Sequence, residues 1–323
     1  MTIKKTNEQV ASLSETASHF DNKWWTREDA ISQRLNIVKD LLKMLDGERV
    51  DLITSARVIN RAFLSCDFIN KKVNKGANIL EMACGYGFVT HVLTEKGYNV
   101  NAFDISKESI SSAKEEAVNL SQNPEIFHIE NEKYLSHLEN DSLDVIIGLG
   151  YLRYLNIDAQ DFVYKHARRI LKPDGILIID HQNDLYEMFA LNNESIIFWN
   201  NLISSYCDLS SILKKDELLD KLQKSISTPI RKRKGHSFSG SFDVSSENPL
   251  TYKDKAKSYG FVINDILYPH CDILPPFLHN HIDKKKLDLI QREYCLKLSR
   301  DWKSMFMCYQ FLTFLKKTNT DLQ

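Results

Sequence analysis

The spacing of apolar residues changes near residue 76. Before that point apolar side chains recur every three or four positions, as in TREDAISQRLNIVKDLLKML (26–45), and this spacing predicts amphipathic helices. From residue 77 onward, short apolar runs alternate with stretches of helical spacing. Strands that alternate with helices of about 10–15 residues predict βαβ units and a parallel sheet with right-handed crossovers.

Seven apolar runs are predicted strands. They are ANILEMA (77–83), YNVNAFDI (98–105), EIFHIE (125–130), SLDVIIGLG (142–150), ILIIDHQ (176–182), VINDILY (262–268) and SMFMCYQFLTFLKK (304–317). The fourth run is continuously apolar, which is typical of a strand buried on both faces. The alternation breaks between 184 and 250 and then resumes, so this segment is predicted to be an insertion into one α/β domain.

The pattern divides the chain into four parts. We expect an N-terminal helical cap, a strand-and-helix core, an inserted lid or acceptor region, and C-terminal strands that complete the sheet. Their predicted limits are 1–75, 76–183, 184–250 and 251–323. A chain of 323 residues is long for one domain, but a single large α/β domain with an insertion accommodates it.

Composition and charge exclude several classes of partner. The chain has 42 Lys and Arg against 43 Asp and Glu, so it offers no overall field for a polyanion, and we expect no nucleic-acid partner. No uncharged apolar run is long enough to span a bilayer, and no apolar stretch follows the lysines near residue 5. We therefore expect a cytoplasmic protein without a membrane partner. The oligomeric state is not predicted.

The turn after the first predicted strand carries the candidate cofactor chemistry. Gly85 and Gly87 allow a tight turn and a close approach of the backbone to a ligand. Asp104 ends the next strand, 19 positions after Gly85, where its carboxylate can accept hydrogen bonds from ribose hydroxyls. The third glycine of a dinucleotide fingerprint is absent. Glu81 within the strand suits a cationic or amine-bearing ligand and opposes a pyrophosphate.

These residues resemble a known family. Glu81-Met82-Ala83-Cys84-Gly85-Tyr86-Gly87 is similar to the ExxCGxG motif of class I S-adenosylmethionine-dependent methyltransferases. The resemblance continues with Asp104 as the ribose-binding acid and with the blocks LDVIIGLGYLRYL (143–155) and LKPDGILII (171–179). It departs at Asn131, where the family usually has Asp, and at Leu143, where it usually has Phe.

The resemblance implies a fold and a cofactor. The fold is α/β: a Rossmann-like, doubly wound, mostly parallel seven-stranded sheet with an N-terminal helical cap and a helical insertion after strand five. The cofactor is S-adenosylmethionine, which becomes S-adenosylhomocysteine. The implied contacts are Cys84, Gly85 and Gly87 at the methionine part, Asp104 and Ile105 at the ribose, Asn131 and Glu132 at the adenine, and Leu149 and Gly150 beneath the sulfonium. Glu81 is also expected to bind the cofactor.

The acceptor side is less specific. Methyl transfer is an in-line displacement, and a hydroxyl acceptor needs a base or a metal to remove its proton. His181 and His270 follow the fifth and sixth predicted strands and are the candidate bases, the alternative being histidines hydrogen-bonded at strand ends. The candidate acceptor-binding residues, all after the fourth strand, are Tyr151, Arg153 and Tyr154. Acidic residues flank His181, but without a tight ligand cluster we expect no metal.

The sequence therefore predicts an S-adenosylmethionine-dependent methyltransferase with a small-molecule acceptor. A looser likeness of 247–276 to methyltransferases of surface sugars and secondary metabolites favours O-methylation of a sugar or small metabolite. A non-enzymatic adenosyl-ligand-binding subunit and an NAD-linked oxidoreductase remain alternatives. Methylation of a nucleic acid is disfavoured, because no Asn/Asp-Pro-Pro-aromatic motif follows the fourth strand.

Overall fold

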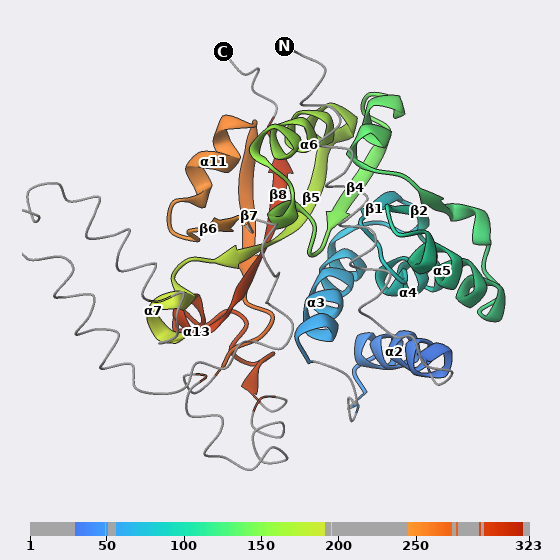
Figure 1. Ribbon diagram of the computed structural model, residues 1–323, viewed down its shortest axis with the longest axis horizontal. Coiled ribbons are helices and arrows are strands. Elements are labelled where there is room, and N and C mark those ends of the chain that lie inside the picture. The colour runs from blue at the N-terminus through green and yellow to red at the C-terminus, as the bar shows by residue number, and fades with distance from the viewer. Residues whose placement is uncertain are drawn as a thin grey trace, which may run out of the picture.

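The computed structural model describes most of the strand-bearing part of the chain (Figure 1). The described residues are 30–48, 50, 56–190, 195, 245–272, 276, 291 and 294–318. Most of the predicted lid, 184–250, lies outside them, so the lid stays a prediction. Among the described residues, no helix is long and apolar enough to cross a membrane.

A single sheet organises these residues, in the strand order β3-β2-β1-β4-β5-β8-β7, with β6 paired to β5. The strands are β1 (Asn78–Met82), β2 (Asn99–Asp104), β3 (Phe127–Ile129), β4 (Leu143–Gly148), β5 (Leu171–Asn183), β6 (Ser246–Glu247), β7 (Phe261–Leu267) and β8 (Gln310–Lys317). Only the pairings of β8 with β5 and with β7 are antiparallel within this sheet. The predicted doubly wound, mostly parallel sheet is confirmed, and the two-residue strand β6 is an addition to the seven predicted strands.

Helices connect the strands. They are α2 (Ala30–Leu45), α3 (Ala56–Lys72), α4 (Phe88–Glu95), α5 (Lys107–Asn119), α6 (Ile157–Ile170), α7 (Tyr186–Ala190), α11 (Tyr252–Ser258) and α13 (Ser304–Met307), with 3-10 turns η1 (Pro124–Ile126), η2 (Glu132–His137) and η3 (Leu152–Tyr154). The chain order runs outward from β1 through β2 to β3, and then returns to β4 on the other side of β1. The strand order thus reverses between β1 and β4, and ligands of open α/β sheets bind beyond the carboxyl ends of the strands at such a point.

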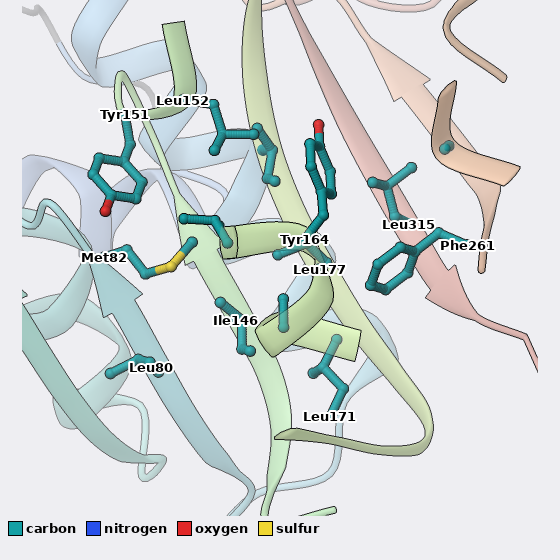
Figure 2. Packing of buried hydrophobic residues seen from close by; sticks show 14 of the residues in the cluster. Leu80, Met82, Ile146, Tyr151, Leu152, Tyr164, Leu171, Leu177, Phe261 and Leu315 are labelled. Carbon is teal, nitrogen blue, oxygen red and sulfur yellow. The ribbon is translucent and has the colours of Figure 1, made fainter. Parts of the chain in front are cut away.

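Both faces of the sheet are buried. One face packs against α2, α3 and α4 in a cluster that contains Ile79 and Ile178. The opposite face packs against α6 and α11 in a second cluster, which includes Leu80, Ile146 and Leu177 (Figure 2). Successive strand residues point to opposite faces, and both sets are apolar, so the central strands read as continuous hydrophobic runs.

One strand prediction is corrected at its start. The run 304–317 was expected to be extended throughout, but its first residues form the short helix α13, and β8 begins at Gln310. The Asn183 side-chain amide donates to the carbonyls of Met305 (2.7 Å) and Cys308 (2.8 Å), which accounts for two carbonyls at the end of this helix. A short apolar run does not by itself distinguish helix from strand, and the Asn183 contact lies 122 residues away in sequence from Met305.

The helix α2 is held against the first half of the sheet by a buried charge. Arg34 donates from Nε to Oε1 of Glu116 on α5, and its guanidinium lies 4.7 Å from the centre of the Tyr86 ring. Burial raises the pKa of Glu116 to about 7, although the Arg34 bond opposes this rise. The N-terminal helix therefore contacts the turn between β1 and α4 through the cation and the ring.

The close packing of Gly87 generates a stability prediction. Gly87 precedes α4 with φ 73°, and an added Cβ would lie 2.5 Å from Cε1 of Phe127. Gly87→Ala should lower the free energy of unfolding by about 2–5 kcal/mol, from left-handed backbone strain and overpacking together. Gly97 has φ 82° and no atom within 4 Å of the same position, so Gly97→Ala reports the strain alone, about 1–2 kcal/mol. Urea denaturation measures both, and equal losses would contradict the packing argument.

Candidate active site

The carboxylate of Asp104 links the ends of β1 and β2. Its Oδ2 accepts the Gly85 N–H at 2.8 Å, and its Oδ1 accepts the Ser106 N–H at 2.8 Å. Each carboxylate oxygen can accept more than one hydrogen bond, so ribose hydroxyls can bind to the same group. The structure thus brings together Asp104 and Gly85, which the sequence analysis placed at one site.

The turn between β1 and α4 forms an open cradle. Ala83, Gly85 and Gly87 have φ of 52°, 53° and 73°, which bends the backbone sharply over five residues. No atom lies within 4 Å of the position that a Cβ would take on Gly85, so the backbone there faces open space. Cys84 is buried, and its N–H donates to the Phe103 carbonyl at 3.0 Å. The turn can therefore receive a ligand directly on its backbone.

Glu81 lies beneath this cradle. Its Oε2 accepts the Thr90 N–H at 2.9 Å and the Thr90 hydroxyl at 2.5 Å. Burial raises the pKa of Glu81 to about 7, the Thr90 bonds oppose the rise, and Asp104 adds to it. A buried carboxylate favours a cationic ligand group such as an amine, because the cation offsets the cost of ionising the carboxylate.

A second carboxylate fixes the turn after β4. Asp180 of β5 accepts the Gly150 N–H at Oδ1 and the Arg61 Nη1–H at Oδ2, the latter at 2.8 Å. Although burial opposes ionisation, Arg61 and Arg153 hold the pKa of Asp180 below its usual value. Leu149 and Gly150, both partly exposed, thus lie at a fixed place beside β1. Arg61 could not be found from the sequence, because its partner is 119 residues away.

The residues predicted at the adenine lie at the end of β3. Asn131 precedes η2, and its Oδ1 accepts the Lys133 N–H at 3.0 Å. The Glu130 N–H donates to the Asp104 carbonyl at 3.0 Å, which ties this segment to β2. Ile105 and Glu132 are partly exposed. Their part in binding adenine stays a prediction.

The three residues predicted to contact the acceptor separate into two groups. Tyr151 and Leu152 turn away from each other at the end of β4 (Figure 2). The Tyr151 hydroxyl is buried without a hydrogen-bond partner in the described chain, and burial, with the charges of Glu132 and Asp104, raises its pKa well above the ordinary value. Tyr151 therefore lies on the Asp104 side of β4. Arg153 and Tyr154 pair with each other, the guanidinium 4.8 Å from the ring centre.

His181 is packed into the sheet. Its ring lies between Tyr252 at 4.3 Å and Phe311 at 4.9 Å, and its Nε2 is 3.1 Å from the Thr313 hydroxyl. Burial lowers the pKa of His181 to about 3, so the ring is neutral at physiological pH. The adjacent Asp180 points to the opposite face of the sheet. This is the environment of a packing histidine, which the sequence analysis held as its alternative to a base.

His270 has an acidic partner. Its Nε2 lies 3.3 Å from Oδ1 of Asp272, and its Nδ1 lies 3.6 Å from the Cys295 sulfur. Asp272 also accepts the Tyr186 hydroxyl. The group is buried beyond the ends of β7 and β8. In the described residues, no three His, Cys, Asp or Glu side chains are arranged to hold a metal ion.

Comparison with known proteins identifies the family. A family model described as "Methyltransferase domain" matches residues 73–259, which is more than half of the chain. The chain belongs to this methyltransferase family. The predicted class of S-adenosylmethionine-dependent methyltransferases is thereby confirmed, and the cofactor of this class is S-adenosylmethionine.

The similar proteins include several methyltransferases. A putative methyltransferase, YqeM, of Bacillus subtilis is 31% identical over 116 residues, 35% of this chain and 45% of that protein. A ubiquinone biosynthesis O-methyltransferase of Rickettsia bellii is 30% identical over 149 residues, 45% of this chain and 59% of that protein. The chain thus spans less than two thirds of either relative. A solved methyltransferase structure from Archaeoglobus fulgidus has a TM-score of 0.45 at 16% identity, over 81% of this chain and 94% of that one.

The methyltransferase domain fits its cofactor at the β1–β2 edge. The open space at Gly85 leaves room for a ligand against the backbone. The buried carboxylate of Glu81 suits the amine of the methionine part, and Asp104 suits the ribose hydroxyls. The buried, unpartnered Tyr151 hydroxyl adds a polar group on the same side. These residues would hold S-adenosylmethionine, and a dinucleotide's pyrophosphate would be opposed by Glu81.

The raised pKa of Glu81 predicts how binding depends on pH. An ionised Glu81 binds the protonated amine of the cofactor better than a neutral one does. Because the pKa of Glu81 is about 7, Glu81 must release a proton when the cofactor binds below pH 7. The dissociation constant for S-adenosylmethionine should fall about tenfold between pH 5.5 and 7.5, where an α-amino group stays largely protonated. Glu81→Gln should flatten this dependence, whereas Glu95→Gln, on the exposed end of α4, should keep it. Calorimetric titration at several pH values measures the effect, and a flat wild-type profile would contradict it.

Proposed function

We propose that this protein is an S-adenosylmethionine-dependent methyltransferase that methylates an oxygen atom of a small molecule, either a sugar or another small metabolite. The observation that carries the proposal is the Asp104 carboxylate bound to the Gly85 N–H, beside an open cradle and above Glu81. The similarity to a ubiquinone biosynthesis O-methyltransferase supports an oxygen acceptor. We expect a small-molecule partner rather than a nucleic acid, in keeping with the net charge of −1.

The chain's residues position the reactants. When bound, the cofactor supplies a methyl group on a sulfonium, which is already a good leaving group. Asp104 and Glu81 hold the two polar parts of the cofactor, while the turn at Gly150, fixed by Asp180, borders the reacting space. Alignment of this kind contributes most to a displacement whose leaving group needs no activation.

His270 is the stronger of the two candidate bases. Its carboxylate neighbour Asp272 can orient the ring and stabilise its protonated form. The acidic residue of a catalytic triad has the same effect on the histidine beside it. His181 lacks such a partner and is neutral with a pKa of about 3, so it is a weak base. We therefore propose that His270 accepts the acceptor's proton, and that His181 packs the sheet between Tyr252 and Phe311.

Cofactor binding by Asp104 is directly testable. In calorimetry, S-adenosylmethionine and S-adenosylhomocysteine should bind the wild type in the micromolar range, and NAD should not. Asp104→Asn should weaken both by about tenfold or more, because a charged acceptor is worth about 1.5–3 kcal/mol per hydrogen bond. Asp158→Ala, an exposed acid on α6, is the matched control and should bind normally. Binding of NAD in preference to the adenosyl ligands would overturn the assignment.

Transfer itself needs an acceptor screen. Incubation with methyl-labelled S-adenosylmethionine and panels of sugars and hydroxylated metabolites should label at least one compound at oxygen. Cofactor binding without transfer to any hydroxyl compound would instead favour the alternative of a non-enzymatic adenosyl-binding subunit.

A further inference from the structure

Arg153 is partly exposed, but two of its guanidinium nitrogens are buried. It lies in η3, directly after β4, at the carboxyl edge of the sheet. Its main-chain carbonyl accepts the Ser245 N–H at 2.9 Å, so the segment before β6 anchors its backbone. The side chain is therefore presented from a fixed position beside the reacting space.

Two of the three guanidinium nitrogens of Arg153 lack a hydrogen-bond acceptor. Its Nε and Nη1 are buried and have no hydrogen-bond partner in the part of the chain that the structure describes. Tyr154 contacts the guanidinium with its ring centre 4.8 Å from the guanidinium carbon and shares a side-chain hydrogen bond with Arg153, but Nε and Nη1 stay without a partner. Buried charges in proteins are almost always paired, because an uncompensated one is costly. An anion from outside the described chain would relieve this cost.

The nearest carboxylate is already bound. The negative charge of Asp180 favours the charged form of Arg153. However, Oδ1 of Asp180 already accepts the Gly150 N–H, and Oδ2 of Asp180 accepts an N–H of Arg61. Two guanidinium groups thus share one carboxylate, and a positive charge is left at the end of β5. The planar fork of an arginine matches the two oxygens of a carboxylate or a phosphate.

The position of this charge favours the acceptor over the cofactor. The residues that fit the cofactor lie on β1 and β2. Arg153 instead interacts electrostatically with Asp180 of β5 and with Tyr309, which precedes β8. The Tyr309 hydroxyl donates to Gln182 at 2.9 Å, at the end of β5. In the strand order, β5 and β8 lie on the side of β4 away from β1. A molecule bound there would meet the methyl group from the opposite side.

We propose that Arg153 binds an oxyanion, a carboxylate or a phosphate, carried by the methyl acceptor. The proposal rests on the methyltransferase function proposed above, and it restricts the acceptor to anionic small molecules. Acidic sugars, sugar phosphates and hydroxylated carboxylic acids belong to this class, and neutral sugars do not. Tyr154 stacks on the guanidinium and keeps its plane oriented.

Probe anions test the site without knowledge of the acceptor. The protein is first saturated with S-adenosylhomocysteine and then titrated with benzoate, with inorganic phosphate and with benzyl alcohol as a neutral match for benzoate. At least one anion should bind the wild type saturably. Arg153→Gln should weaken that binding by about tenfold or more, and Arg153→Lys should retain part of it. Arg300→Gln, at an exposed arginine paired with Asp265, removes the same charge and should bind like the wild type.

Thermal stability separates a ligand site from a structural role. Because two of its buried N–H groups are unpaired, Arg153→Gln should lower the melting temperature of the ligand-free protein less than Arg61→Gln does. Arg61→Gln should lower it clearly, since Asp180 loses the cation that is hydrogen-bonded to it. A drop in Arg153→Gln as large as that in Arg61→Gln would overturn the proposal, as would equal anion binding in that variant, or no saturable binding of either anion by the wild type.

The same titrations distinguish the two proposals. If Arg153→Gln loses affinity for S-adenosylhomocysteine while anion binding persists, the guanidinium serves the cofactor and the acceptor proposal fails alone. If the wild type does not bind S-adenosylhomocysteine, the methyltransferase function fails. In that case the anion titration without it still decides whether Arg153 holds an oxyanion.

Discussion

The arrangement of the site depends on one carboxylate that replaces a missing backbone contact. Where β1 and β2 end, their ladder of hydrogen bonds ends too, and Asp104 continues it by accepting the N–H groups of Gly85 and Ser106. The turn at Gly85 is thereby held open with its backbone facing outward, and α5 begins immediately beyond Ser106. Because the acceptor is a carboxylate, these bonds can be stronger than ordinary turn contacts. The same group can then bind a ligand without rearranging.

Asp180 performs the corresponding role on the other side of the strand reversal. It joins β5 to the turn at Gly150 and to Arg61 of α3, so an N-terminal helix is fastened to the edge where ligands bind. Asp104 and Asp180 thus fix the two turns that border β1 and β4. Glu81 lies between them in the sheet and supplies a third carboxylate. Burial raises its pKa to about 7, and a bound cation would lower that pKa. Glu81 and Arg153 have side chains of opposite charge and lie on opposite sides of β4, which matches a cationic cofactor and an anionic acceptor.

The sheet and the closeness of Asp104 to Gly85 could be predicted because their signals are local. Each βαβ unit repeats a short pattern, and Gly85 and Asp104 are 19 residues apart on adjacent strands, so spacing alone places them together. The ion pair of Arg61 and Asp180 joins positions 119 residues apart, and no sequence pattern in the helix or the strand predicts it. Strand alternation places Asp180 and His181 on opposite faces, but it does not say which face is covered by Tyr252. For the same reason sequence reasoning listed Tyr151 with Arg153, although the tyrosine turns toward the Asp104 side.

Hydrogen–deuterium exchange with and without S-adenosylhomocysteine tests most directly whether the carboxyl edge at β1, β2 and β4 binds an adenosyl ligand. At saturating ligand, amides in 84–87, 104–106 and 149–151 should exchange more slowly, while those of β7, at the far edge of the sheet, should be unchanged. Protection confined to these turns would support the account, because it follows the two carboxylate-fixed segments on either side of the strand reversal. Unchanged exchange in all three segments, or protection found mainly in β7 and β8, would contradict it.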